Sequence, residues 1–224
     1  MSLPLVVIDG LPCTGKSTLI HRLERNYHLH AYTEPVSVWQ GEENFVPGFR
    51  HNFLGEFLSL RRNEDFYKLQ LAVAETLADR DTKATAANRY EQHKISILER
   101  SVHSGIYFVE AELADRAGKE VLQAVIDRLA KSTYGETPIA RVYLRLAPEE
   151  ALKRCRRRAH SSEEGYDFAT MLALHNSHEQ FLRNSAAKEI CVTHASIDAV
   201  YAEVVSFLSS IGPMRKKKPL EEEE

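Results

Sequence analysis

Short apolar runs and longer stretches with helical spacing take turns along this chain. The apolar runs predict strands over residues 5–8, 28–33, 94–98, 139–146 and 189–193. Between them, apolar side chains recur every three or four residues, which predicts helices over residues 18–25, 53–58, 66–80, 102–117, 120–131, 148–158, 167–184 and 197–211. Strands that alternate with helices pair in parallel through right-handed crossovers. We therefore expect an α/β fold with a five-stranded parallel sheet and helices on both faces.

Length and composition favour a single domain. The chain has 224 residues, of which 43% are apolar and 27% are charged, enough for one sizeable domain and too little for two. We expect this domain to span residues 1–212. Residues 213–224 hold four basic side chains followed later by four glutamates, and such a charge block predicts a disordered tail. A nuclear-targeting signal at residues 215–218 is the weaker alternative.

Charge, cysteine spacing and hydropathy argue against several classes of protein. The formal net charge of −3 gives no general basic surface for nucleic acid. Cys13, Cys155 and Cys191 lie far apart without metal-ligand spacing, which predicts a reducing, cytoplasmic compartment and a structural role for Cys13. The apolar run at residues 5–8 is too short for a signal peptide, and no window approaches a membrane span.

The most specific motif follows the first apolar run. Residues 10–18 fit G-x-x-x-x-G-K-[ST], in which main-chain N–H groups turn inward around a phosphate. Lys16 would reach the β- and γ-phosphates, and Ser17 would offer its hydroxyl to Mg²⁺. The helix that begins near Lys16 would add its positive dipole end. We expect ATP to contact Gly10, Leu11, Pro12, Cys13, Thr14, Gly15, Lys16, Ser17 and Thr18. The alternative is a plain strand-to-helix turn.

Charged side chains follow two further predicted strands. Glu34 comes after the second strand, where a carboxylate can take a proton from an attacking hydroxyl; the alternative is a surface glutamate. Glu99 and Arg100 end the third strand. There Glu99 would hold Mg²⁺ and Arg100 would lie beside the transferring phosphoryl group, or the two would form a structural pair. Trp39, the only tryptophan, would offer a flat face to a base or belong to the core.

Arginines gather in one segment of the chain. Arg154, Arg156, Arg157 and Arg158 precede a polar loop that ends at Gly165. Phosphoryl transfer needs positive charge over the transferring oxygens. A run of arginines alone is usually a solvated helix face, but the polar, glycine-ended loop beside it favours an arginine-rich lid.

Together these motifs resemble the deoxyribonucleoside kinases, which include deoxycytidine, deoxyguanosine and thymidine kinases of cellular and viral origin. The resemblance covers residues 5–208 in the family's order. It rests on the phosphate loop, Glu34-Pro35-Val36 with Trp39, Gln70 on a helix, Glu99-Arg100-Ser101, and the arginine segment that ends in Glu163-Glu164. It implies a P-loop kinase fold, ATP as phosphoryl donor, Mg²⁺ as cofactor, a deoxyribonucleoside acceptor and a homodimer.

The resemblance also implies roles at the phosphate end of the site. Glu34 would be the general base at the nucleoside 5′-hydroxyl, and Arg100 and Lys16 would complete the catalytic set. Ser17 and Glu99 would hold Mg²⁺. The cationic contacts to the ATP phosphates would be Arg154, Arg156 and Arg158.

Further roles concern the nucleoside. Gln70 would form paired hydrogen bonds with the base, because its amide offers both a donor and an acceptor. Trp39 would pack on the edge of the base and Phe108 would stack on its face. Glu164 would accept a hydrogen bond from the sugar 3′-hydroxyl. The family's tyrosine for this hydroxyl has no counterpart near Leu58 or Ser59, which predicts looser sugar recognition.

Base preference is implied by the positions around Gln70. These are Val73, Leu77 and Gly105. Deoxycytidine and deoxyguanosine kinases place an arginine and an aspartate at the last two. The present chain has an uncharged pocket with room for a methyl group, similar to the thymidine-accepting members. We therefore expect thymidine as the first substrate and deoxycytidine as the second.

Two other functions compete with this one. A nucleoside monophosphate kinase, such as thymidylate kinase, shares the phosphate loop and a lid, but it needs a second phosphate site, and no extra arginine lies at residues 34–39. A regulatory NTPase would bind or hydrolyse nucleotide without any nucleoside. That alternative leaves Glu34, Trp39 and Gln70 unexplained.

Overall fold

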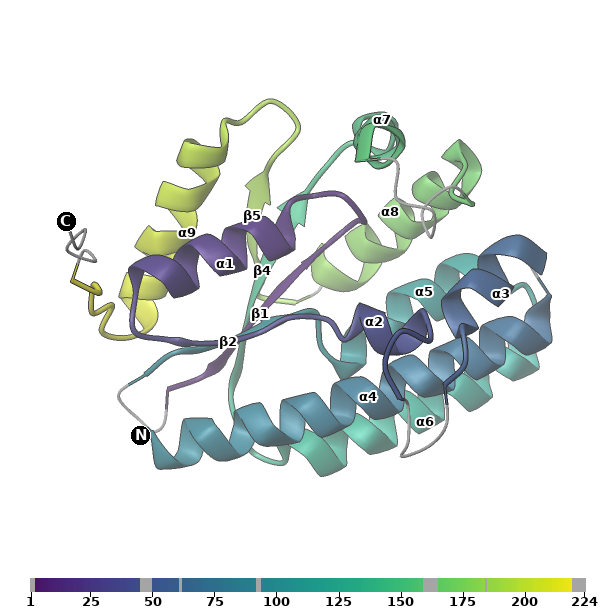
Figure 1. The fold of residues 1–224 in the computed structure, drawn as a ribbon, viewed down its shortest axis with the longest axis horizontal. Coiled ribbons are helices and arrows are strands. Elements are labelled where there is room, and N and C mark those ends of the chain that lie inside the picture. The colour runs from purple at the N-terminus through teal and green to yellow at the C-terminus, as the bar shows by residue number, and fades with distance from the viewer. Residues whose placement is uncertain are drawn as a thin grey trace.

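A parallel five-stranded sheet forms the centre of the computed structural model, which describes residues 3–44, 50–60, 62–91, 94–158, 165–183 and 185–218 (Figure 1). The strand order is β2-β3-β1-β4-β5. The strands are β1 (Leu5–Gly10), β2 (His30–Tyr32), β3 (Ser96–Glu99), β4 (Ile139–Arg145) and β5 (Lys188–Cys191). Ile8 of the central strand pairs with Glu99 on one side and Val142 on the other. The predicted α/β class and five-stranded parallel sheet are confirmed.

Helices cover both faces of the sheet because alternate side chains of β1 point to opposite sides. Val6 and Ile8 belong to one buried cluster, and Leu5 and Val7 belong to another. The first cluster is shared with α1 (Lys16–Asn26), α7 (Pro148–Arg158), α8 (Phe168–Arg183) and α9 (Ile197–Ile211). The second is shared with α2 (Val36–Trp39), α3 (Phe53–Leu60), α4 (Asn63–Tyr90), the 3₁₀ turn η1 (Val102–Ser104), α5 (Gly105–Glu112) and α6 (Arg116–Tyr134). Figure 1 shows α1 and α9 above the sheet and α4 and α6 below it.

Both ends of α4 and the break between α5 and α6 differ from the sequence prediction. Helix α4 begins three residues earlier and ends ten residues later than expected, since alanine and other helix-favouring residues continue past Arg80. Asp65 does not cap it but pairs with Arg62, whose Nε donates to Oδ2 at 2.6 Å. The break between α5 and α6 falls before Asp115 rather than at Gly118, because the Asp115 carboxylate accepts from the N–H groups of the new helix. None of the described helices is long and apolar enough to cross a membrane.

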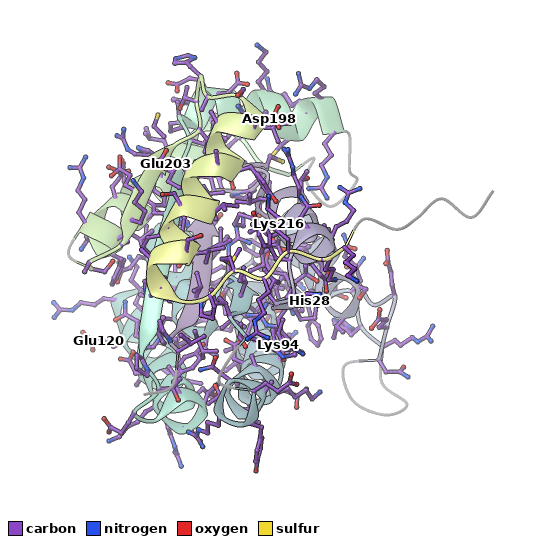
Figure 2. All side chains as sticks on the ribbon, turned by 90° about the vertical axis from the view of Figure 1, so that its left-hand side faces the viewer. His28, Lys94, Glu120, Asp198, Glu203 and Lys216 are labelled. Atoms are coloured by element: carbon purple, nitrogen blue, oxygen red, sulfur yellow. A yellow bond between two sulfur atoms is a disulfide. The ribbon has the colours of Figure 1, made fainter. Side chains whose placement is uncertain are left out.

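Part of the charged tail is paired with the body of the protein. Lys216 forms an antiparallel bridge with Tyr27. The N–H of His28 donates to the Arg215 carbonyl and that of Lys217 to the Asn26 carbonyl, both at 2.9 Å. Figure 2 shows Lys216 and His28 on the same side of the molecule. The prediction of a disordered tail from residue 213 onward therefore does not fit residues 215–217, because their main chain is paired despite their charge.

Candidate active site

The carboxyl end of the sheet opens into a cavity of about 920 Å³. Open parallel sheets bind ligands at this end of their strands. The phosphate loop after β1, the end of β2, the end of β3, and helices α4 and α7 contribute to its walls. The predicted site residues that line it are Pro12, Cys13, Thr14, Gly15, Lys16, Ser17, Thr18, Glu34, Trp39, Gln70, Val73, Leu77, Glu99, Arg100, Gly105, Phe108, Arg154 and Arg158. The fold thus brings most of the predicted site to one place.

The phosphate loop has the backbone that a phosphate cradle needs. Gly10 and Gly15 have φ angles of 153° and 90°, in the region that favours glycine. A Cβ on Gly10 would lie 2.7 Å from the Leu144 carbonyl oxygen, so the loop also requires glycine there for space. Gly10 and Leu11 are buried beneath the loop, and their carbonyls accept from Lys16 Nζ at 3.2 and 2.9 Å. The lysine is thereby held under the loop at the start of α1.

The electrostatic state of Lys16 is set by its burial. The side chain is 4% exposed. Burial, assisted by the nearby Arg100 charge, lowers the pKa of Lys16 from 10.5 to about 8, against the opposing effect of Glu99, Glu34 and Asp9. A bound anion would favour the charged ammonium, because the cost of burying a charge falls when it is paired. Lys16 is therefore suited to a ligand that brings negative charge.

Ser17 and Glu99 form the candidate Mg²⁺ site. The Ser17 hydroxyl donates to Glu99 Oε1 at 2.8 Å. Within the described residues, no group of three or more His, Cys, Asp or Glu side chains is arranged to hold a metal ion. Protein Mg²⁺ sites commonly use one or two carboxylates and complete the shell with water and substrate phosphates. A hydroxyl and a carboxylate beside a phosphate loop fit that requirement.

Glu34 and Arg100 form an ion pair at the neighbouring ends of β2 and β3. Nη1 of Arg100 donates to both carboxylate oxygens of Glu34, at 2.7 and 2.6 Å, and Nη2 donates to the Gly10 carbonyl at 3.0 Å. The two side chains are 11% and 9% exposed. Burial acts to lower the pKa of Arg100, but Glu34 outweighs it and the pKa is raised. The guanidinium carbon lies 5.0 Å from the centre of the Phe108 ring, so Phe108 flanks this pair.

Gln70 lines the cavity and carries a buried polar atom that no group in the described part of the chain pairs. Its side chain is 4% exposed, and its Oε1 has no hydrogen-bond partner in the described part of the chain. A buried carbonyl oxygen without a partner is costly, so a ligand that donates a hydrogen bond to this amide would gain by doing so. Val73, Leu77 and Gly105 also line the cavity. A Cβ on Gly105 would lie 3.8 Å from Gln70 Oε1, so glycine keeps space open beside the amide.

Trp39 is both a core residue and a cavity residue, which were the two alternatives left open by the sequence. The side chain is 6% exposed and packs in the core cluster below the sheet, yet it lines the cavity. Its Nε1 donates to the Thr76 hydroxyl at 2.9 Å. The indole is thereby fixed in orientation by α4, the helix that carries Gln70.

The arginines of α7 are placed differently from the prediction in one respect. Arg154, Arg157 and Arg158 line the cavity, whereas Arg156 is not among the described lining residues. Residues three and four apart share a helix face, so Arg157 and Arg158 lie on the same face of α7 as Arg154. Arg154 is held by Glu150 Oε1 at 3.1 Å and by the Val192 carbonyl at 3.2 Å. Glu164 lies outside the described residues.

Cys13 and Cys155 are joined by a disulfide, which corrects the expectation of isolated thiols. Their Cα atoms are 5.6 Å apart although 142 residues separate them in the sequence. Helix α7 crosses close to the phosphate loop and brings the two residues together. Spacing along the chain is therefore no argument for a reducing compartment. Cys191 is free and exposed.

Several cavity residues were not among the predicted site residues. They are Phe57, Phe66 and Leu69 near Gln70, Tyr166 after the arginine segment, Ala195, Ile197 and Val200 after β5, and Arg157, which had been named in the arginine segment but not as an ATP contact. The rule that ligands lie beyond the carboxyl ends of strands would have pointed to the stretch after β5. Helix phase would have pointed to Arg157.

Comparisons with known proteins agree with this geometry. Residues 6–208 match the sequence model of the deoxynucleoside kinase family, and the chain belongs to that family. It is 27% identical over 184 residues to the mitochondrial thymidine kinase 2 of Homo sapiens, covering 80% of this chain and 64% of that protein. It is 24% identical over 193 residues to deoxycytidine kinase 2 of Gallus gallus, covering 79% and 73%.

A solved structure shares the fold. The deoxyadenosine kinase from M. mycoides with bound dCTP superposes with a TM-score of 0.70 over 92% of this chain and 99% of that one, at 15% identity. The chain thus spans nearly all of that structure and somewhat less than two thirds of the human relative's length.

Proposed function

We propose that the protein transfers the γ-phosphoryl group of ATP, with Mg²⁺, to the 5′-hydroxyl of a pyrimidine deoxyribonucleoside, with thymidine favoured over deoxycytidine. One observation carries this proposal. The Glu34–Arg100 pair lines the same cavity as the phosphate loop, and so does Gln70, whose amide oxygen no described residue pairs. A site for nucleotide alone would need only the loop. The family also supports the proposal, and its relatives include a thymidine kinase and a deoxycytidine kinase.

Glu34 is the group that would accept the proton. As the 5′-oxygen bonds to the γ-phosphorus, its proton passes to a Glu34 oxygen, and the bond from phosphorus to the ADP oxygen breaks. A carboxylate has about four lone-pair sites, so Glu34 can accept from Arg100 and from a hydroxyl at once. Arg100 holds the carboxylate in orientation for this step through two hydrogen bonds.

Lys16 and the α7 arginines supply the positive charge at the donor end. Lys16 would exchange its carbonyl partners for phosphate oxygens, and Arg154 and Arg158 line the same cavity. Mg²⁺, when bound by Ser17 and Glu99, would offset the charge on the phosphate oxygens. Catalysis would then come mainly from positioning and charge stabilisation.

Thymidine preference follows from the uncharged walls around Gln70. The amide would donate to and accept from the Watson–Crick edge of a pyrimidine. Val73, Leu77 and Gly105 place no charge there and leave room for a 5-methyl group. Deoxycytidine presents the same edge size without the methyl group, which makes it the second substrate.

An acceptor panel tests the proposal. ATP and Mg²⁺ would be supplied with thymidine, deoxycytidine, deoxyadenosine, deoxyguanosine or thymidine monophosphate at equal concentration, and the product identified by mass spectrometry and ³¹P NMR. We expect thymidine 5′-monophosphate as the main product. Reaction of the monophosphate alone would indicate a nucleoside monophosphate kinase. ATP hydrolysis that no acceptor stimulates would indicate a regulatory NTPase.

We also infer a homodimer through the outer face of α4 and α6. Leu71 on α4 and Val121 on α6 are 40% and 61% exposed, and these two helices pack side by side below the sheet (Figure 1). Sedimentation analysis of the intact chain tests this. Monomers at micromolar concentration would contradict it, and Val121→Glu is expected to shift the equilibrium toward monomers.

A further inference from the structure

Arg80 is a mostly buried arginine whose guanidinium nitrogens all donate hydrogen bonds within the protein. It lies on α4, and its side chain is 11% exposed. Nη1 donates to the carbonyl oxygens of Thr33 and Glu99, at 3.1 and 2.8 Å, and Nη2 donates to the carbonyl of Arg100 at 2.8 Å. Arg80 is not among the described residues that line the cavity. It therefore acts on the main chain behind the site.

The three carbonyls belong to the segments that carry the candidate acceptor groups. Thr33 immediately precedes Glu34, and the other two carbonyls are those of Glu99 and Arg100 themselves. Strands β2 and β3 are paired up to Tyr32 and Leu98, so their ladder ends just before these residues. Beyond the ladder, the guanidinium of Arg80 connects the two strand ends.

The backbone at Arg100 needs such support. Its φ angle is 55°, in the left-handed region that a residue with a Cβ rarely adopts. The Arg100 N–H donates to the Ile8 carbonyl at 3.0 Å, and the Arg100 carbonyl accepts from Arg80. These two bonds fix the peptide groups on both sides of the residue. This left-handed residue is the one whose side chain pairs with Glu34.

Arg80 is itself held by its neighbour. Nε donates to Asp81 Oδ1 at 2.8 Å, and Asp81 is fully buried. The second oxygen of Asp81 accepts from the Val102 N–H at 3.2 Å and from the Tyr134 hydroxyl. A network from α4 and α6 thus locks the guanidinium in one orientation, and its planar fork matches the spread of carbonyls in a way that a lysine ammonium cannot.

We infer that Arg80 is a positioning residue for the Glu34–Arg100 pair. By fixing the main chain at Thr33, Glu99 and Arg100, it sets the distance and direction of the carboxylate from the phosphate loop. This inference rests on the proposed function, because it assigns the pair to the acceptor side of phosphoryl transfer. It adds a residue that does not touch the substrate.

Two variants test the inference against one control. Arg80→Lys keeps the charge and removes the fork, and Arg80→Gln removes the charge as well. The exposed Arg89 of the same helix gives the control, Arg89→Lys. For both Arg80 variants we expect kcat at saturating substrates to fall about 10²-fold, because small misplacements of catalytic groups have costs of this size. ATP affinity should change less than about 2-fold, and the control should match the unmodified protein.

A second readout does not require turnover. Hydrogen exchange of the Arg100 N–H, followed in a peptide across residues 96–104, should accelerate at least 10-fold in the Arg80 variants and remain unchanged in the control. A merely structural role would lower the unfolding temperature while kcat per ATP-binding molecule stayed constant. Unchanged kcat and unchanged exchange in Arg80→Lys would overturn the inference even if Arg80→Gln did not fold. Failure of the proposed function would differ, since the unmodified protein would then transfer phosphate to no nucleoside.

Discussion

Glu34 and Arg100 meet through one guanidinium nitrogen, which donates to both carboxylate oxygens at 2.7 and 2.6 Å. The two residues are 66 positions apart and belong to the ends of adjacent strands. Two charge-assisted hydrogen bonds at this low exposure fix the direction of the carboxylate, which a general base requires.

Replacement of Glu34 by glutamine should therefore separate binding from turnover. The amide keeps the shape but cannot accept the proton, so we expect kcat to fall about 10²-fold or more. ATP affinity, measured by calorimetry, should change little. Glu42→Gln, a nearby change at an exposed position, provides the control. Full turnover in Glu34→Gln would rule out Glu34 as the base.

The lowered pKa of Lys16 predicts proton uptake when ATP binds. At pH 8.5 a group with a pKa of about 8 is mostly neutral in the free protein, and the triphosphate favours its charged form. Calorimetry in two buffers of different ionisation enthalpy should give an uptake of about 0.7 protons per ATP. Affinity should weaken as the pH rises through 8. Lys16→Met, which does not titrate, should show no such uptake; equal uptake in both proteins would contradict the assignment.

Acid lability should arise partly from His178. The imidazole is fully buried, and burial lowers its pKa from 6.5 to about 3, with the Leu174 carbonyl acting in the opposite direction. Between these values the unfolded chain binds a proton that the folded chain excludes, so stability is lost as the pH falls from 6.5 toward 3.

Urea unfolding at several pH values measures this loss. One such group contributes a slope of up to about 1.4 kcal/mol per pH unit. His178→Asn should reduce the slope between pH 4 and 6.5, whereas the exposed His194→Asn should not. Equal slopes in all three proteins would exclude His178 as a source of the effect.

The disulfide predicts sensitivity to reducing agents. A cross-link across 142 residues restricts the unfolded chain, so Cys155→Ser should lower the free energy of unfolding by about 3 to 5 kcal/mol. Dithiothreitol should have a similar effect on the unmodified protein and none on Cys155→Ser. Cys191→Ser is the matched control because Cys191 is free and exposed. Three reactive thiols in the folded, non-reduced protein would contradict the pairing.

Local patterns were sufficient for the parts of the site that depend on neighbouring residues. The phosphate loop, Glu34 and Glu99-Arg100 could be recognised because each follows an apolar strand, and parallel strands end at one edge. Trp39 could be proposed as a face for a base because it is the only tryptophan, but Gln70 could be proposed only through the resemblance to a family, since a glutamine on a helix has no signature of its own.

Long-range contacts account for what could not be predicted. Cys13 and Cys155 meet because α7 crosses the loop, and Arg80 reaches carbonyls on two other segments. No sequence pattern links either set. The alanine-rich end of α4 and the face of α7 that carries Arg157 were different cases. In both, the sequence contained the signal. For α4 the predicted helix ended too early, and for α7 the predicted contacts did not follow the spacing of three to four residues that defines one helix face.

The central position of β1 has a consequence for how the protein is made. This strand is synthesised well before its partners, which are Ser96–Glu99 and Ile139–Arg145. A fully buried apolar strand must therefore wait for about 140 residues of synthesis before both of its edges are paired. During that interval the nascent chain holds a finished phosphate-loop sequence that has no sheet to support it, and the apolar residues 5–8 are open to aggregation.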